Sequence, residues 1–354
     1  MEINPETSRR ITILRFPLIA AIVLIHGGIN MEVSPSTIFV STLGTNILAR
    51  VAVPLFFVVS GWLFFINFNL TLKDYIKKIK SRFFTLCIPY LFWNLSFLLL
   101  IFFLQSFPFT ASFLENNFQK LVANYNFQDY LEAFGVMGGD PILLPLWFLR
   151  DLIYLVIISP IFYIIAQKTP ALSLLIILLP LLPEANLPFV NLRFISSIVF
   201  FYLGCLIAVQ RWDVTKIDRW NSLILPTYLL LAISLSVLRT THELTWGNQI
   251  QFLLNCLGVM AAWCLSQKIL ETKLETLLIA LTPFTFFVYA AHEPTAMVLR
   301  KILSRFLPAS QPSIALIYYL LIPILAITIT LAVAKILKKH LPQFFNLITG
   351  GRVN

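Results

Sequence analysis

Long apolar stretches recur along the whole chain and are separated by short segments that hold most of its charge. A helix needs about 20 predominantly apolar residues to cross the hydrocarbon core of a bilayer. Ten stretches reach this length, with boundaries placed to within a few residues. They cover approximately residues 11–30, 46–66, 83–106, 146–166, 171–188, 192–210, 222–239, 250–267, 276–297 and 313–334. The pattern predicts an all-α membrane protein, a single polytopic domain with about ten transmembrane helices.

The composition agrees with this prediction and excludes a soluble globule. Hydrophobic residues make up 58% of the chain and charged residues 12%, whereas a soluble domain carries about 25% charged residues. The net charge of +10 does not indicate a nucleic-acid partner, because the basic residues are scattered among short loops between apolar stretches. The predicted partner is therefore the lipid bilayer.

The cysteines give no indication of a metal or redox centre. All of them fall within apolar stretches, and none forms a CxxC pair or has the spacing of zinc ligands. We expect them to be packing residues, and we predict no metal site. The residues are Cys87, Cys205, Cys256 and Cys264.

Lysine and arginine residues set the expected orientation, since short cytoplasmic loops carry an excess of both. Basic clusters lie at 9–10, 73–82, 211–219 and 335–339. With ten spans, all of these clusters share one side of the membrane if both termini are cytoplasmic. The basic residues of 298–308 fall on the opposite side in this scheme. We therefore expect 298–308 to form an amphipathic helix on the membrane surface.

The first apolar stretch carries two ionisable residues, Arg15 and His26. Their spacing of eleven residues is close to three helical turns, so both lie on one face, roughly 16 Å apart along the axis. With Arg15 at a headgroup boundary, His26 falls near the middle of the membrane, where an ionisable group indicates a functional site. A neutral imidazole can take a proton from a hydroxyl and return it, as acyl transfer to an alcohol requires. The alternative is a hydrogen bond to a neighbouring helix that only supports assembly.

Arg15 itself has two interpretations. An arginine near the end of a helix can anchor the span at the interface, or its guanidinium can bind a phosphate or carboxylate. Together with Lys80 and Arg82 it would then bind a polyphosphorylated donor such as acyl-coenzyme A. An extended pantetheine arm would reach from these charges toward His26. The basic segment 73–82 is otherwise an ordinary signal of topology.

The second apolar stretch combines Arg50 with Pro54 and the small pair Ser60 and Gly61. Small residues let helices approach closely, which accounts for Ser60 and Gly61 without any ligand. A nucleophilic role for Ser60 is not expected, because the local sequence supplies no base. We include Arg50 and Ser60 among the candidate substrate-binding residues.

The fourth apolar stretch opens with Trp147 and contains Asp151, a carboxylate within a span. Trp147 fits an aromatic belt at the membrane interface. Asp151 is expected either to pair with an arginine or to orient His26, as the carboxylate of a hydrolytic triad does. The candidate arginines are Arg150, Arg50 and Arg193.

The ninth apolar stretch ends with His292 and Glu293, which lie near the outer surface if the termini are cytoplasmic. An interfacial histidine beside a glutamate is either simply solvated or lines the approach of an acceptor. We include both, with Trp147 and Asp151, among the candidate substrate-binding residues.

These pieces, in this order, resemble the acyltransferase-3 family of bacterial integral-membrane acyltransferases, which modify cell-surface and extracellular glycans. The resemblance covers nearly the whole chain, and the form of the second-span motif with Pro54 resembles the short, stand-alone branch. It rests on Arg15 with His26; Val53-Pro54-Leu55-Phe56-Phe57 with Ser60-Gly61; Lys80-Ser81-Arg82 followed by Pro89-Tyr90 and Trp93; Leu146-Trp147-Phe148-Leu149; Tyr202-Leu203-Gly204; and Tyr289 with His292.

The resemblance implies an acyltransferase of a bacterial inner membrane. It would move an acyl group, usually acetyl, from cytoplasmic acyl-coenzyme A to a hydroxyl of a glycan or of a lipid-linked sugar precursor. His26 would be the catalytic histidine, and Arg15 its charged partner near the donor. Arg82 would match the family's basic position after the second span.

Two other functions stay open at this point. In a proton-coupled transporter, His26 would relay protons and Arg15 would select an anion, although no internal repeat typical of transporters is visible. In a non-catalytic partner of polysaccharide synthesis or export, the pair would serve assembly, although buried charge costs more than assembly needs. Homo-oligomerisation is open as well.

Overall fold

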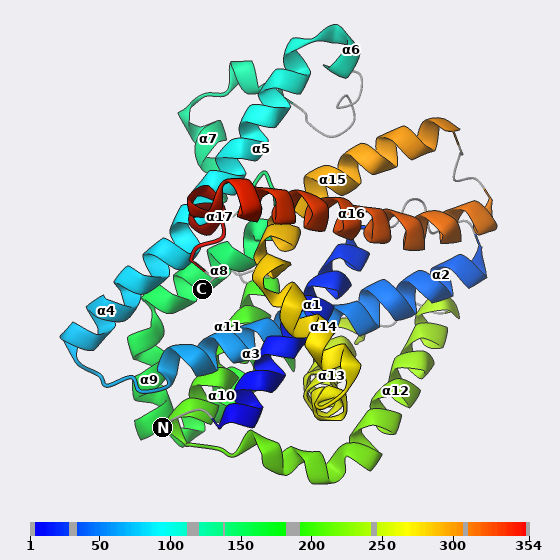
Figure 1. The fold of residues 1–354 in the computed structure, drawn as a ribbon. Helices are drawn as coiled ribbons and strands as arrows, with labels where there is room; N and C mark the ends of the chain where they lie inside the picture. Colours follow the sequence, from blue (N-terminus) through cyan, green and yellow to red (C-terminus); the bar gives the residue numbers. More distant parts are fainter. Residues whose placement is uncertain are drawn as a thin grey trace.

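The computed structural model describes residues 4–27, 34–111, 120–136, 139–181, 192–241, 246–306 and 311–351. These residues form helices and no strand, as the all-α prediction requires. In Figure 1, α1 (Pro5–Ile25) lies within the bundle and contacts several helices from the last third of the chain. These are α13 (Gly247–Ile269), α14 (Lys273–Leu281), α15 (Thr285–Phe306) and α16 (Pro312–His340).

Six continuous helical segments in the described part of the chain are long and apolar enough to cross a membrane. They are Pro35–Phe65, Leu72–Ser106, Val214–Thr241, Gly247–Ile269, Lys273–Phe306 and Pro312–His340. A seventh arises if Leu144–Ile157 and Ser159–Lys168, which are bent by 60°, form one broken span. The protein is therefore a multi-pass membrane protein. The count of about ten spans and the side of each terminus stay predictions.

Most of the long segments are built from several helical elements in direct succession. The first contains α2 (Pro35–Ser41), the π-helix η1 (Thr42–Leu48), η2 (Ala49–Val51) and α3 (Ala52–Phe65), and the second contains α4 (Leu72–Arg82), the π-helix η3 (Phe83–Cys87) and α5 (Ile88–Ser106). Later ones join η7 (Val214–Trp220) to α12 (Asn221–Thr241), and α14 through η8 (Thr282–Phe284) to α15. Shorter elements connect them: α6 (Pro108–Ala111), η4 (Val122–Asn124), α7 (Phe127–Ala133), η5 (Leu144–Leu146) and α17 (Pro342–Ile348).

The predicted fourth and fifth spans are interrupted in the structure. The fourth is divided into α8 (Trp147–Ile157) and α9 (Ser159–Lys168). Pro160 explains the break, because proline removes a backbone donor and disfavours helical geometry in the residue before it. The fifth is only the short α10 (Pro170–Leu178) with η6 (Leu179–Leu181), and the rest of 171–188 lies outside the described residues.

The predicted first and sixth spans are helices, but the first carries too many charges and the sixth is too short to cross a membrane unaided. Every window of eighteen residues in α1 contains Arg9, Arg10 and Arg15. The sixth prediction corresponds to α11 (Leu192–Val209), which is apolar but short. Both helices are packed among others, so protein contacts replace part of what a lipid environment would supply.

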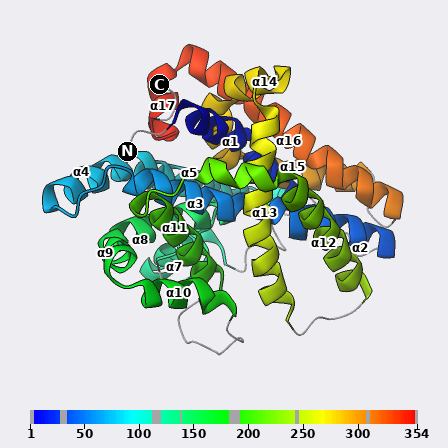
Figure 2. The ribbon, with the colours of Figure 1, turned by 90° about the horizontal axis from the view of Figure 1, so that it is seen from below.

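α3 and α11 cross at two glycines, and Figure 2 shows them lying against each other. A Cβ added to Gly61 would lie 2.1 Å from the carbonyl oxygen of Phe201, and one added to Gly204 would lie 2.1 Å from that of Val58. The two backbones therefore meet as closely as small residues allow in membrane helices. This crossing accounts for Gly61 on purely structural grounds.

A charged cluster fixes the beginning of α1. Arg9 binds Glu275 of α14 in a bidentate ion pair, with nitrogen–oxygen distances of 2.7 and 2.8 Å. Arg10, only 1% exposed, lies 2.7 Å from the carboxylate of Asp218 in η7. These contacts gather the segments around 9–10, 211–219 and 270–275 at one end of the bundle. The side of the membrane on which this end lies stays a prediction.

We predict that Gly204→Ala destabilises the protein by about 1–3 kcal/mol, because the new methyl group must push two backbones apart. Thermal unfolding of the purified protein in detergent measures the effect. Gly139→Ala is the matched control, since a Cβ at that position meets nothing within 4 Å. Equal melting temperatures for both variants would show that the α3–α11 contact is looser than described.

Candidate active site

His26 follows the last turn of α1 and faces α15. α1 finishes at Ile25, and His26 takes the capping position, with φ −94° and ψ 2°. Gly27 comes next against α16, where an added Cβ would lie 2.2 Å from the ring of Pro323. Only glycine allows α16 to approach the end of α1 this closely. The His26 side chain is 19% exposed, so protein covers most of it.

A carboxylate from α15 accompanies this imidazole. The Nδ1 atom of His26 and the Oε2 atom of Glu293 are 3.3 Å apart. The other carboxylate oxygen, Oε1, accepts a hydrogen bond from Arg300 Nη2 at 2.6 Å. Arg300 also donates through Nη1 to the backbone carbonyl of His26. One guanidinium therefore holds both the carboxylate and the end of α1.

His292 lies beside this group and is fully buried. The rings of His26 and His292 have centroids 5.3 Å apart, and His292 is 0% exposed. Its Nδ1 lies 2.6 Å from the backbone carbonyl of Tyr289. Because a carbonyl oxygen only accepts, we assign the hydrogen to Nδ1 and a lone pair to Nε2. Among the described residues, Nε2 has no hydrogen-bond partner.

Tyr289 connects this histidine pair with the entry to α8. Its hydroxyl donates to the backbone carbonyl of Pro145 in η5, and its ring packs edge-on against Phe148, with centroids 6.3 Å apart. The same residue also accepts the hydrogen bond from His292 through its carbonyl. Any displacement of η5 is therefore transmitted directly to the backbone that orients His292.

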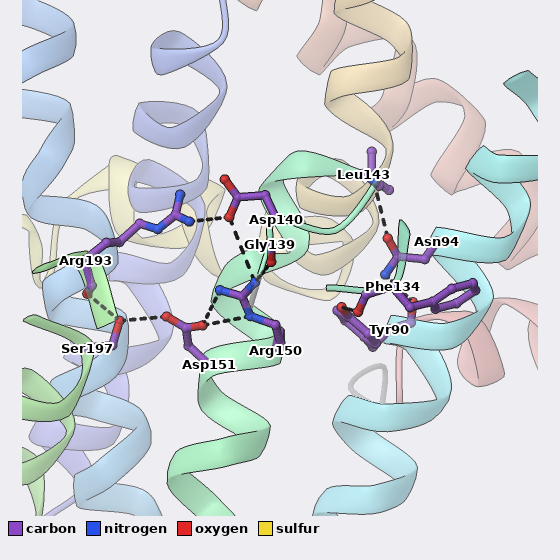
Figure 3. Close-up of polar contacts among 10 residues, drawn as sticks. All are labelled: Tyr90, Asn94, Phe134, Gly139, Asp140, Leu143, Arg150, Asp151, Arg193 and Ser197. Atoms are coloured by element: carbon purple, nitrogen blue, oxygen red, sulfur yellow. Dashed lines mark hydrogen bonds and ion pairs between the residues drawn. The ribbon is translucent and has the colours of Figure 1, made fainter. Parts of the chain in front are cut away.

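A second polar cluster lies at the start of α8, as Figure 3 shows. Arg150 binds Asp151 with an Nη2–Oδ1 distance of 2.8 Å and donates to the carbonyl oxygen of Gly139. The other oxygen of Asp151 accepts from Ser197 at 3.1 Å. Asp140 pairs with Arg193 of α11. Asp151 thus has an arginine and a hydroxyl as partners, and the carboxylate beside His26 is that of Glu293.

The same close-up shows how the segment before α8 is held from the other side. Asn94 of α5 accepts from the backbone amide of Leu143 at 3.3 Å, and Tyr90 donates to the carbonyl oxygen of Phe134 at 2.6 Å. The guanidinium of Arg193 lies over the indole ring of Trp147, with its central carbon 4.5 Å from the ring centroid. Trp147 therefore belongs to the second cluster, whereas His292 and Glu293 belong to the first.

The residues expected at the donor end are separate from both clusters. Arg15 is half-buried on α1 and has no polar partner in the described part of the chain. Arg82, also half-buried, lies 6.0 Å from the ring centroid of Phe64. Lys80 is exposed on α4. No described contact joins these three residues to one another, and their role in donor binding stays a prediction.

Arg50 and Ser60, the two candidates of the second apolar stretch, lie in one continuous helical segment, Pro35–Phe65. Arg50 is exposed in η2, and Ser60 is half-buried in α3, one residue before the glycine that packs on α11. No described contact connects either residue with His26 or Asp151. Their assignment to substrate binding stays a prediction.

Arg300 is the site residue that the sequence did not reveal. The expectation of a helix at 298–308 is confirmed up to Phe306, the last described residue there, and this helix is the unbroken continuation of α15. Its position at the membrane surface stays a prediction. Continuity places Glu293 and Arg300, seven residues apart, on one helix face. The sequence held one signal for Arg300: the basic residues of 298–308 did not fit the rule that places lysine and arginine on the cytoplasmic side.

Comparison with known proteins agrees with the sequence resemblance. Residues 9–335 match the family model of the acyltransferase-3 domain, described as an acyltransferase domain. The chain belongs to this family and is an acyltransferase, so the transporter hypothesis is set aside. It is similar to the succinoglycan biosynthesis protein ExoH of Rhizobium meliloti (strain 1021), at 26% identity over 363 aligned residues. That alignment covers 99% of this chain and 94% of the relative. No solved structure matches the chain.

We predict that Asp151→Ala lowers the stability of the folded protein by about 3–5 kcal/mol, because it leaves the buried Arg150 without its carboxylate. Asp140→Ala is the matched control and should cost about 1 kcal/mol or less, since this ion pair with Arg193 is partly solvated. The two aspartates are 1% and 37% exposed. Thermal unfolding in detergent measures both. Unchanged melting of Asp151→Ala with loss of activity would instead favour a substrate-binding role.

Proposed function

We propose that the protein is a membrane O-acyltransferase that moves an acyl group, acetyl in the first instance, from cytoplasmic acyl-coenzyme A to a glycan hydroxyl. The acceptor is a cell-surface or extracellular polysaccharide or its lipid-linked precursor, and the location is the bacterial inner membrane. The observation that carries the proposal is the contact of His26 with Glu293, held in place by Arg300. Family membership supplies the reaction type.

His26 has the arrangement of a general base. Its Nδ1 faces a carboxylate, so the hydrogen belongs there and Nε2 keeps the lone pair. Nε2 takes the proton from the acceptor hydroxyl as the oxygen attacks the thioester carbonyl. When the tetrahedral intermediate collapses, the carbon–sulfur bond breaks and the departing thiolate receives that proton. Glu293 stabilises the imidazolium between these steps, as the carboxylate of a hydrolytic triad does.

The donor would bind with its charged part away from His26. Arg15 lies eleven residues earlier on the same helix, roughly 16 Å along the axis. A guanidinium that has no polar partner among the described residues suits phosphate, and Arg82 and Lys80 would extend this contact. The thioester would then reach His26 at the end of an extended arm, and the negative charge of the tetrahedral intermediate requires a nearby hydrogen-bond donor.

The acceptor is inferred from the similar protein, whose name assigns it to succinoglycan biosynthesis. We infer a polysaccharide or its precursor for this chain as well. The polar cluster of Asp140, Trp147 and Arg193 supports this inference, because an indole face and partly exposed charged groups are suited to a sugar ring and its hydroxyls. Asp151 would act behind this surface by fixing Arg150.

We predict that His26→Ala reduces acyl transfer by about 10²–10⁴-fold while the protein still inserts and folds, because the general base is lost. The measurement is the acyl content of the surface polysaccharide, by mass spectrometry, in a deletion strain that carries each variant. Consumption of labelled acetyl-coenzyme A by isolated membranes checks the same step. His340→Ala, an exposed histidine at the end of α16, is the control. Undiminished transfer by His26→Ala would end the assignment.

We predict that Arg15→Ala weakens acetyl-coenzyme A binding by about 10–100-fold, in line with the loss of a charge-assisted hydrogen bond. Arg15→Lys should weaken binding less, because it keeps the charge and loses only the planar fork. Calorimetric titration of the purified protein provides the dissociation constants. Arg219→Ala, an exposed arginine of η7, is the control. Equal affinity in wild type, Arg15→Ala and Arg15→Lys would mean that Arg15 only anchors α1.

A further inference from the structure

Three potential metal ligands converge where α1 meets α15. His26, His292 and Glu293 each offer one potential ligand atom, and these atoms all lie within 4.8 Å of one another. His292 and Glu293 are neighbours on α15, whereas His26 follows α1 near the N-terminus. The spacing of these residues along the chain gives no hint of the group, which exists only in the fold.

The buried Nε2 atom of His292 is the strongest indication of a ligand. Its lone pair is directed by the hydrogen bond that Nδ1 makes with the Tyr289 carbonyl, and it has no partner among the described residues. The Oε2 atom of Glu293 is likewise buried without a well-aligned hydrogen bond. The facing donor atom, Nδ1 of His26, lies 3.3 Å from Oε2, whereas no described donor faces Nε2 of His292. A positive ion bound between Nε2 and Oε2 would satisfy both buried acceptors.

The surroundings also match those of metal sites. Metal-binding histidines usually donate their second ring nitrogen to a carbonyl or carboxylate, and metal-binding carboxylates are themselves hydrogen-bonded. His292 donates to Tyr289 in this way, and Glu293 accepts from Arg300 at 2.6 Å. The orientation of two of the three ligands is therefore fixed before any ion arrives.

We propose that His26, His292 and Glu293 form a reversible binding site for a divalent transition-metal ion of the Zn²⁺ class, and that the bound ion blocks acyl transfer by occupying His26. Two imidazoles and one carboxylate are a ligand set that zinc accepts, with a fourth position open. Mg²⁺ and Ca²⁺ prefer oxygen ligands throughout. The inhibitory consequence rests on the proposed function of His26 as the base, whereas the binding itself does not.

The affinity should be moderate. The ligand atoms must move closer together to reach zinc distances of about 2.0–2.2 Å, and His26, at the end of a helix, is the ligand best placed to move. The guanidinium of Arg300 also opposes a second positive charge near Glu293. We therefore expect dissociation constants in the micromolar range, which suits a reversible inhibitor better than a permanent structural ion.

Calorimetric titration of the detergent-purified full chain with ZnCl₂ tests the site, with MgCl₂ as the reference ion. We expect one zinc ion per chain and no magnesium binding. His292→Ala and Glu293→Gln should each weaken zinc binding at least tenfold, while His340→Ala should bind as wild type does. Glu293→Gln keeps the shape of the side chain, so it remains informative if His292→Ala does not fold. Absence of zinc binding by the wild type, or equal binding by all variants, overturns the site.

Acyl transfer measured on the same preparations separates this inference from the proposed function. Zinc should inhibit the wild type over the concentration range in which it binds, and a chelator should restore activity. Site-specific binding without inhibition would keep the metal site and overturn both the inhibitory role and His26 as the base. Inhibition that persists unchanged in His292→Ala with residual activity would place the zinc effect elsewhere and overturn the proposal.

Discussion

The ion pair between Glu293 and Arg300 is the contact on which the candidate site depends. Charged side chains within an apolar bundle need partners from the protein, because removal of one member leaves the other uncompensated at a cost of about 3–5 kcal/mol. Here the pair also engages both the ring and the backbone carbonyl of His26. A single electrostatic contact thus joins the first helix to the ninth predicted span and sets where the imidazole lies.

Tyr289 extends this dependence to the rest of the molecule. Its carbonyl orients His292, and its hydroxyl holds Pro145 at the entry to α8. The segment around Pro145 is fixed in turn by Arg150 and Asp151, next to the partly exposed pair of Asp140 and Arg193. The two polar clusters are therefore mechanically connected, although no side chain belongs to both. A ligand at the second cluster would therefore contact the same framework that positions His26.

The sequence was sufficient for local features and insufficient for those that require distant segments to meet. Composition and apolar length predicted an all-α membrane protein, and residue order identified the family. His26 could be selected as an ionisable residue within an apolar stretch, eleven positions after Arg15, and Glu293 from its position near the end of another stretch. Their contact joins residues far apart in the chain, and no periodicity encodes it. For Asp151 the sequence offered either an arginine partner or His26, and the structure confirms the pairing with its neighbour Arg150.

Helix continuity was the other feature that apolar length could not determine. Hydropathy treats 146–166 as one span, but Pro160 divides it into two helices at 60°. The charges of 298–308 suggested an amphipathic surface helix, and in the structure this helix is the continuation of α15 to Phe306. A helix can continue through a charged region when the charges have partners within the protein, and Arg300 pairs with Glu293.

Arg300 also explains why the imidazole of His26 can lie at the very end of a helix. The last carbonyls of a helix lack intrahelical donors, and an unsatisfied end inside a membrane is unfavourable. Arg300 supplies a donor to the His26 carbonyl while its other nitrogen holds Glu293. Its planar fork makes both contacts in a fixed relative geometry, which the single ammonium group of lysine cannot reproduce. One side chain, Arg300, therefore determines both the position of His26 and the orientation of the carboxylate beside it.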